Sequence, residues 1–175
     1  MGDRARAFAA RLDEAWTSAI AYRSGGRLGS ITRLARWLDA QAPDVVYVLD
    51  MALAGVLASA WHRARRRAPF VVDTGDAITA LARSGGDRSA VGLAATAALE
   101  RYALASADAL VVRGSYHRDM LRARGIGATF IPDGVDLTLF SPVDGTATRR
   151  AFAFGDGVVV GLVGASIWSP ALNLT

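Results

Sequence analysis

The chain of 175 residues contains no cysteine and no lysine, so all 20 of its basic residues are arginine. The absence of cysteine excludes a disulfide scaffold and favours a protein of a reducing compartment. Hydrophobic residues make up 52% of the sequence, which is enough to form a sizeable core at this length. We therefore expect a globular protein, with the cytoplasm as its location.

Long hydrophobic runs and a secretory leader are missing as well. The longest apolar window, residues 45–61, contains Asp50 and is too short and interrupted to cross a bilayer. The first four residues, Met-Gly-Asp-Arg, lead into an amphipathic helix and not into the apolar segment of a signal peptide. Neither pattern points to a membrane span or to secretion.

The arginines give a formal net charge of +4 and allow two interpretations. A basic surface attracts anionic partners, which would permit peripheral contact with membrane lipids. Arginines scattered over a solvated surface account for the same charge. No basic run is interleaved with aromatic residues, so we expect no nucleic-acid partner.

Short apolar runs alternate with helical patterns along most of the chain. Strands are predicted at Asp44–Leu49, Pro69–Val72, Ala109–Val112 and Ala128–Ile131, and helices at 4–22, 29–41, 52–67, 89–106 and 115–124. A single helical turn is expected within 77–88. This rhythm implies right-handed crossovers and an α/β fold, a Rossmann-like parallel sheet with flanking helices. The nearly continuous apolar character of the first strand favours a central position, and that of Ala109–Val112 favours burial on both faces.

Several local features refine this pattern. Ser115 is expected to cap the helix that follows it, and Gly125 to end that helix in the left-handed conformation. The basic residues at 63–67 complement the negative end of a helix dipole, although contact with a lipid or acceptor is an alternative. His62 in the same turn is expected to be solvated.

The composition changes after Phe140. Residues 141–146 resemble a linker, 147–154 favour a short helix, and the apolar run Val158–Gly164 predicts a strand with no partner. We expect a partial first domain over 1–144 and the opening of a truncated second domain over 145–175. The glycines near the end of that run lack the spacing of a dinucleotide fingerprint, which excludes a dehydrogenase.

One stretch, 99–140, identifies a family by its motifs. It reads E-R-x-x-L-x-x-A-D-A-x-V-V and, after a helix ending in glycine, I-P-D-G-V-D-x-x-x-F-S-P. This order resembles glycosyltransferase family 4, and the resemblance extends over 43–164. It implies a GT-B architecture of two Rossmann-like domains, of which 1–144 would be the acceptor-side domain and 145–175 the start of the donor-side domain.

The resemblance also implies the chemistry of the complete enzyme. A sugar would pass from a nucleotide-diphosphate sugar to a glycan, lipid or small-molecule acceptor, with no metal and no other cofactor, because helix N-termini and basic side chains stabilise the departing diphosphate. The donor-side groups are not found in this chain. We therefore expect the isolated chain to be an inactive fragment.

Candidate site residues follow from the same motifs. Asp76 matches a family aspartate and is the catalytic candidate, while Gly75 stands where many members carry histidine. Asp73 is a candidate binding residue, although ordinary turn chemistry would explain both aspartates equally well. No further carboxylate has suitable spacing for a metal.

Other binding candidates come from later turns. They are Arg113, Gly114 and Ser115 at a strand end, Asp133 and Gly134 in the second motif, and Gly164 as a backbone donor to phosphate. The alternative for Arg113 is a surface arginine beside a capping serine. Gly134 is expected to have a positive φ and Asp136 to cap the next turn, which gives both a role in shaping the cleft and the hinge.

Three further points stay open. Glu100 matches a family glutamate, and a structural hydrogen bond explains it at least as well as catalysis does. His117 is a weak candidate in the turn after Ser115. A non-catalytic Rossmann-like binding module and a nucleotide-sugar epimerase of the same two-domain plan remain alternatives to the transferase.

Overall fold

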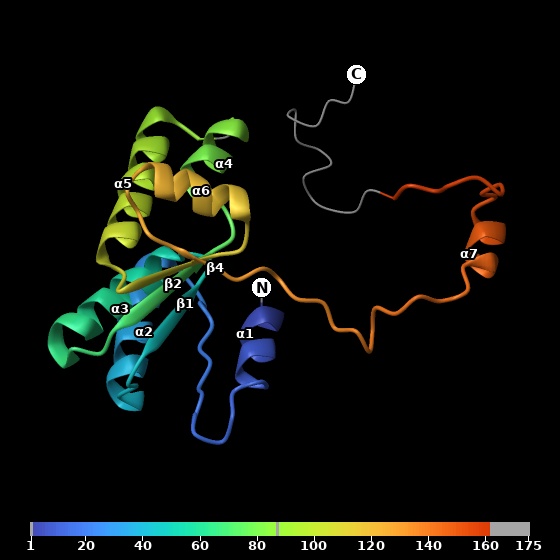
Figure 1. Cartoon of the computed structure of the whole chain (residues 1–175). Coiled ribbons are helices and arrows are strands. Elements are labelled where there is room, and N and C mark those ends of the chain that lie inside the picture. Colours follow the sequence, from blue (N-terminus) through green and yellow to red (C-terminus); the bar gives the residue numbers. More distant parts are fainter. Residues whose placement is uncertain (1, 87, 162–175) are drawn as a thin grey trace. The chain divides into compact units, whose positions relative to one another are not determined.

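The computed structural model describes residues 2–86 and 88–161 of the chain (Figure 1). It separates into two compact units, residues 1–133 and residues 134–175. The strands that the structure describes all belong to the first unit, and each unit is described on its own below. Within the described residues, no helix has the length and apolar character that spanning a membrane requires.

The first unit is built on a parallel sheet of four strands. They are β1 (Val46–Leu49), β2 (Phe70–Thr74), β3 (Ala109–Val112) and β4 (Thr129–Phe130), hydrogen-bonded in the order β1-β2-β3-β4. This confirms the predicted α/β fold. The central position expected for β1 is wrong, because β1 pairs only with β2 among the described strands and forms an edge of this sheet.

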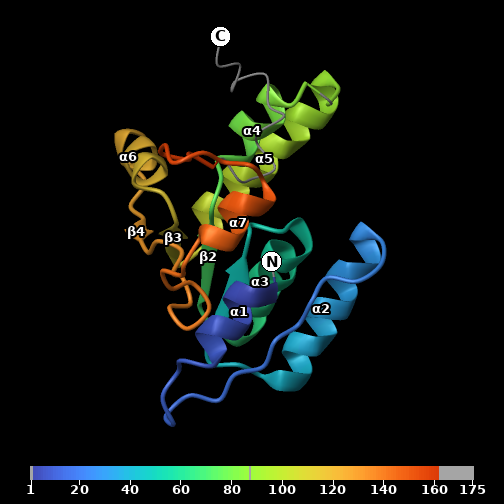
Figure 2. The same cartoon turned by 90° about the vertical axis from the view of Figure 1, so that its right-hand side faces the viewer.

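Helix α2 (Arg27–Gln41) precedes the first strand. Four further helices connect the strands by crossovers: α3 (Leu53–Arg66), α4 (Ile78–Ser84), α5 (Ala90–Ser106) and α6 (Ser115–Ala123). Helix α3 joins β1 to β2, α4 and α5 join β2 to β3, and α6 joins β3 to β4. Helix α2 packs along α3 (Figure 2). The predicted helices from residue 27 to residue 123 are therefore confirmed, with small changes at their ends.

The core lies on one face of the sheet. The strand register places alternate residues on this face, where the helices contribute further apolar side chains: Val48, Phe70, Val72, Leu110 and Val112 from the strands, and Val56, Ala103, Leu104 and Leu121 from α3, α5 and α6. All are at most 8% exposed. On the other face Val111 is buried, but Ala109 is exposed, so the expected burial of β3 on both faces holds only for its last three residues.

Helix α1 (Gly2–Ala9) lies on the side of the sheet opposite α3 and α5 (Figure 1). Its Phe8 ring meets Tyr47 of β1 edge to face, with centroids 5.7 Å apart. The predicted helix over 4–22 is confirmed for residues 4–9 and wrong beyond them, because residues 10–26 form neither helix nor strand. Leu12 and Trp16 are 45% and 56% exposed, so the apolar stripe beyond α1 has no surface to cover, and most helical stability comes from such packing.

The joints before and after α6 test two local predictions. Gly125 has φ of +74° just after the helix and is the expected left-handed C′ residue. The expected cap is wrong, because Gly114 occupies the N-cap position and Ser115 is the first helical residue, with no side-chain cap. A serine placed inside the first turn cannot accept the bonds that an N-cap accepts.

The end of α3 is tied to its neighbours by charged groups. Arg63 lies 2.7 Å from the Asp108 carboxylate, whose other oxygen accepts a hydrogen bond from the Phe70 amide at the start of β2. The Phe70 hydrogen bond and Arg63 lower the pKa of Asp108. The aspartate of the A-D motif therefore connects the end of α3 with the amino ends of β2 and β3.

The prediction that His62 is solvated is wrong. This residue is only 1% exposed, with Nδ1 3.4 Å from Asp39 of α2. The reason is that α2 packs over this side of α3, which a pattern within α3 alone does not reveal.

The second unit is largely irregular in the part that the structure describes. It contains α7 (Thr146–Ala151), and Asp136 accepts hydrogen bonds from the Thr138 amide and hydroxyl, as expected of a turn cap. Gly134 lacks the positive φ that was expected, since the turn needs no left-handed residue there. The predicted strand is absent from Val158–Gly161, which have no pairing partner, and its remainder at 162–164 lies outside the described residues.

Candidate functional site

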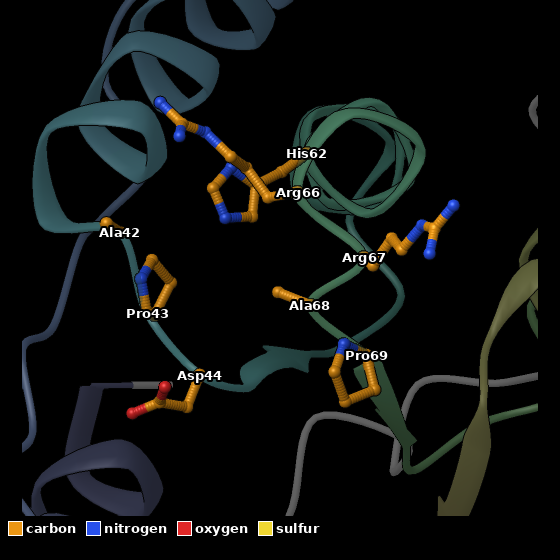
Figure 3. A pocket seen from close by; sticks show the side chains of 8 residues that line it. All are labelled: Ala42, Pro43, Asp44, His62, Arg66, Arg67, Ala68 and Pro69. Carbon is orange, nitrogen blue, oxygen red and sulfur yellow. The ribbon is translucent and has the colours of Figure 1, made fainter.

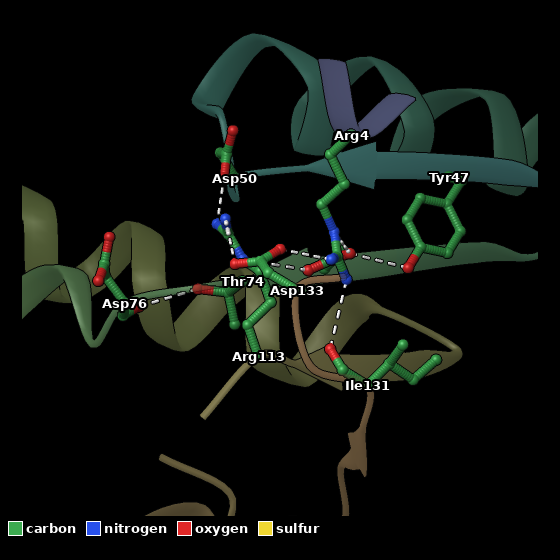
Figure 4. Close-up of polar contacts among 9 residues, drawn as sticks. Arg4, Tyr47, Asp50, Thr74, Asp76, Arg113, Ile131 and Asp133 are labelled. Atoms are coloured by element: carbon green, nitrogen blue, oxygen red, sulfur yellow. Dashed lines mark hydrogen bonds and ion pairs between the residues drawn. The ribbon is translucent and has the colours of Figure 1, made fainter. Parts of the chain in front are cut away.

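The carboxyl ends of the four strands bring together charged residues that are far apart in the sequence. Asp50 follows β1, Asp73 lies in β2, Arg113 follows β3 and Asp133 comes three residues after β4 (Figure 4). In an open parallel sheet this edge is where ligands bind. The structure thus gathers three of the predicted site residues, Asp73, Arg113 and Asp133, at the edge where a site is expected.

Arg113 lies between carboxylates from three different strand ends. Its guanidinium hydrogen-bonds Asp50, while Nε is 3.7 Å from Asp73 Oδ1 and Nη1 is 3.7 Å from Asp133 Oδ2. Its side chain is 23% exposed. Asp73 Oδ1 and Arg113 Nε are both buried and lack a hydrogen-bond partner among the described residues. At 3.7 Å these two atoms form an ion pair, but they are too far apart for a hydrogen bond.

Arg4 reaches the same cluster from α1. Its Nε donates to Asp73 Oδ2 at 2.9 Å, and its Nη1 lies 2.5 Å from Asp133 Oδ1. The Tyr47 hydroxyl also donates to Asp73 Oδ2, at 2.9 Å. Burial and this hydrogen bond raise the pKa of Tyr47, so its hydroxyl keeps the proton that it donates. Desolvation opposes the charge on Arg4, but the pKa of Arg4 is raised because its contacts with Asp73 outweigh that cost.

Three members of this cluster, Arg4, Tyr47 and Asp50, were not predicted from the sequence. Asp50 carried a usable signal, because it follows a predicted strand directly. Tyr47 lies on the face of β1 opposite the core, where Phe8 of α1 contacts its ring. Arg4 carried no signal, since its partner Asp73 is 69 residues away in the chain. For Asp73, the structure does not show the alternative of ordinary turn chemistry, because its carboxylate contacts Arg4, Tyr47 and Arg113, which all lie far from it in the chain.

Gly75 leaves the space that Arg113 fills. A Cβ built at Gly75 would fall on the guanidinium of Arg113. The glycine found where the family resemblance leads one to expect histidine is therefore matched by an arginine from the next strand. A cation from residue 113 occupies the place beside this strand end that a side chain at residue 75 would otherwise take.

The catalytic candidate Asp76 lies beside this cluster, at an exposed position after β2. Its carbonyl accepts a hydrogen bond from the Thr74 hydroxyl at 2.8 Å, and its carboxylate has no hydrogen bond within the part of the chain described (Figure 4). Gly114 faces open space, so the backbone there is accessible, and Ser115 is exposed. Both remain predicted binding residues.

A pocket opens at the same edge, between α4 and α6. Its volume is about 350 Å³, and it is lined by Gly75, Asp76, Ala77, Ala80, Leu81, Ser84, Gly114, Tyr116, His117 and Met120. It contains the catalytic candidate and a predicted binding residue from two different strand ends. Glu100 lies nearby under α4, where Oε2 accepts the Thr79 amide at 3.3 Å, which is the structural role that the sequence allowed.

The remaining predicted residues lie elsewhere. Gly134 belongs to the second unit, and Gly164 lies outside the described residues. A second pocket of about 350 Å³ lies at the amino ends of β1 and β2, between the ends of α2 and α3 (Figure 3). It lies at the opposite end of the strands from the edge that binds ligands in parallel sheets, so we do not take it as the site. Within the described residues, no three metal-binding side chains come close enough to hold a metal ion.

Comparison with known proteins agrees with this geometry. The model of the glycosyl transferase 4-like domain matches residues 2–134, which include all four strands and every charged residue of the carboxyl-edge cluster. No curated protein matches the chain. A family match over this span, together with the parallel sheet and its flanking helices, shows that the chain belongs to the glycosyl transferase 4-like family.

Proposed function

We propose that this protein is the acceptor-side part of an enzyme that transfers a sugar from a nucleotide-diphosphate sugar to a hydroxylated acceptor. The observation that carries the proposal is the cluster at the carboxyl edge of a family-matched sheet, with Asp76 and its pocket beside it. The family match supports a glycosyltransferase-like protein, and the arrangement of charges suggests which substrate this part would hold.

The charges at the edge suit hydroxyl groups better than a diphosphate. Two guanidinium groups, of Arg4 and Arg113, face three carboxylates, of Asp50, Asp73 and Asp133, so the formal charge of the cluster is negative. A diphosphate favours sites with an excess of cations or with helix N-termini. Carboxylates paired with arginines instead present acceptors and donors side by side, which is what sugar hydroxyls need. We therefore assign the donor diphosphate to the other domain of the complete enzyme.

Within this scheme the residues take different roles. Asp76 accepts a hydrogen bond from the acceptor hydroxyl, because its carboxylate is exposed and lies at the strand end. Arg113, held by three carboxylates and fitted against Gly75, orients the hydroxyl groups next to it. Gly114 lets the ligand approach the backbone. On the family resemblance we propose a transfer that uses neither a metal nor another cofactor.

A chimera tests the proposal. Residues 1–140 would replace the acceptor-side domain of a complete enzyme of the family, and transfer from several nucleotide sugars to a panel of hydroxylated acceptors would be measured. We expect transfer, and we expect Asp76→Asn to lower it by roughly 10- to 100-fold, the loss of a charge-assisted hydrogen bond, without changing the melting temperature. The matched control is Asp119→Asn, which alters an aspartate of α6 that is 58% exposed.

Two results would count against the proposal. One is a folded chimera that binds the nucleotide but transfers to no acceptor. The other is sub-micromolar binding of UDP, GDP or ADP by the 175-residue chain in calorimetry, because it would place the donor site in this part. We expect no such binding, and no transfer by the 175-residue chain alone.

A further inference from the structure

The pocket between α4 and α6 contains a histidine that the proposed mechanism does not use. His117, in the first turn of α6, is 6% exposed and lines the pocket. Both of its ring nitrogens are buried and lack a hydrogen-bond partner among the described residues. Buried polar atoms nearly always have a hydrogen-bond partner. Two buried nitrogens without one, in the wall of a pocket, therefore indicate that a ligand or an ordered water binds there.

The protonation state of His117 limits which hydrogen-bonding groups such a ligand can present to it. Burial lowers the pKa of His117, and Arg124 acts in the same direction, while the negative charges of Glu100 and Asp76 oppose the shift. A neutral imidazole has one nitrogen that donates and one that accepts. A hydroxyl group both donates and accepts, and therefore fits either nitrogen.

The rest of the wall is mainly apolar and carries no cation. Apart from His117, Asp76 and Ser84, the lining side chains are apolar or aromatic: Ala77, Ala80, Leu81, Tyr116 and Met120. No arginine lines the pocket in the part of the chain described, and the Asp76 carboxylate stands at it. This combination disfavours an anion, such as a phosphate or an acidic lipid headgroup, and favours a neutral molecule with an apolar group.

Entry to the histidine requires a small movement of the wall. The two ring nitrogens are covered in this structure. Leu81 and Tyr116 are 61% and 83% exposed, so few contacts hold their side chains in place. Their displacement by a ligand exchanges water contacts for apolar contacts, and that exchange is favourable.

We propose that this pocket is the acceptor subsite and that it binds a neutral glycoside with an aryl or alkyl group. A sugar hydroxyl pairs with His117, the apolar group packs on Leu81, Tyr116 and Met120, and the reacting hydroxyl is directed to Asp76. This inference rests on the proposed function for the name of the ligand, but the pocket and its unpaired histidine do not depend on transfer.

Binding to the 175-residue chain tests the proposal without any transfer. The probe is 4-nitrophenyl β-D-glucopyranoside, followed by amide chemical shifts, with 4-nitrophenyl phosphate as the anionic counterpart. We expect saturable shifts at residues 75–84 and 114–120 with the glucoside, and weaker binding of the phosphate. Tyr116→Ala should weaken glucoside binding by about fivefold, the value of one aromatic contact, while Tyr102→Ala, which removes an exposed tyrosine of α5, should leave it unchanged.

A second variant isolates the hydrogen bond. His117→Phe keeps a ring of similar size in the wall but removes both nitrogens, and we expect it to weaken binding of the glucoside by about tenfold. Absence of saturable shifts, tighter binding of the phosphate, or equal effects of the two tyrosine variants would each overturn the proposal. If the chimera transfers while the pocket stays empty, this inference fails and the proposed function stands. If the pocket binds the glucoside and the chimera never transfers, the proposed function fails, and the pocket is a glycoside-binding site but not an acceptor subsite.

Discussion

Asp73 has no exposed surface, and its buried carboxylate is surrounded by partners. One oxygen accepts hydrogen bonds from Arg4 and Tyr47, and the other lies 3.7 Å from Arg113. A buried carboxylate without such partners would cost several kcal/mol, in the range of roughly 3 to 5. The partners come from α1, β1 and the end of β3, so this one side chain ties three separate parts of the chain to the carboxyl edge.

His117 gives a prediction for pH at the same scale. Because burial lowers the pKa of its folded form below the usual 6.5, the unfolded chain takes up a proton before the folded chain does. The free energy of unfolding should therefore fall as the pH decreases below 6.5, and His117→Gln should make this fall smaller. Urea unfolding between about pH 7.5 and 5 measures the difference.

The titration itself can be observed directly. The ring protons of His117 in nuclear magnetic resonance should titrate below pH 6.5. A titration at or above that value would show that the ring is solvated or paired with a carboxylate, and would contradict the burial described for it.

Helix α3 depends on a close approach to β1. A Cβ added at Gly55 would lie 2.9 Å from Val48 Cγ1, and Val48 is part of the core. Gly55→Ala should lower the free energy of unfolding by about 1 kcal/mol or more, because the overpacking outweighs the better helix propensity of alanine. Urea denaturation provides the measurement.

The matched control for Gly55 is the glycine of α2. A Cβ at Gly29 would have no atom within 4 Å, so Gly29→Ala should leave stability unchanged or raise it by about 0.5 kcal/mol. Equal behaviour of the two variants would mean that the contact between α3 and β1 is looser than the structure shows.

At the scale of the whole molecule, the packed core and the charged cluster both lie within residues 1–133. All residues of the core cluster belong to that range, and none of the described residues from 134 to 161 is buried. A chain of residues 1–133 should therefore unfold at the same urea concentration as the full chain. A clearly lower midpoint would show that the second unit supports the first and would favour the sequence-based boundary at residue 144.

Limited proteolysis of the full chain gives the companion result. Cleavage should occur first after Asp133, where every described residue up to Thr148 is exposed, and should leave a stable fragment ending near that residue. Early cleavage within the crossover helices would contradict this expectation.

Much of the fold was predictable because its signals are local. The apolar runs at 69–72 and 109–112, the helix start near residue 89 and the left-handed Gly125 each depend on neighbours in the chain, and the structure has them where the pattern placed them. The structure adds the cap of that helix, in which the Ser89 hydroxyl accepts a hydrogen bond from the Gly92 amide at 3.2 Å. The predicted site residues Asp73, Arg113 and Asp133 came from the family motifs, and the structure brings them together because the carboxyl ends of parallel strands meet at one edge.

Other features were decided by contacts between distant segments. Helix α1 ends at Ala9 because nothing covers the apolar stripe beyond it, and His62 is buried because α2 packs over α3. Arg4 reaches Asp73, and Arg113 fills the space beside Gly75, only once the strands are aligned. The sequence by itself determined the order of the elements and the family, since both reside in local patterns and motifs. Which charges meet, and where a histidine is buried without a hydrogen-bond partner, depends on side chains that only the tertiary structure brings within a few ångströms.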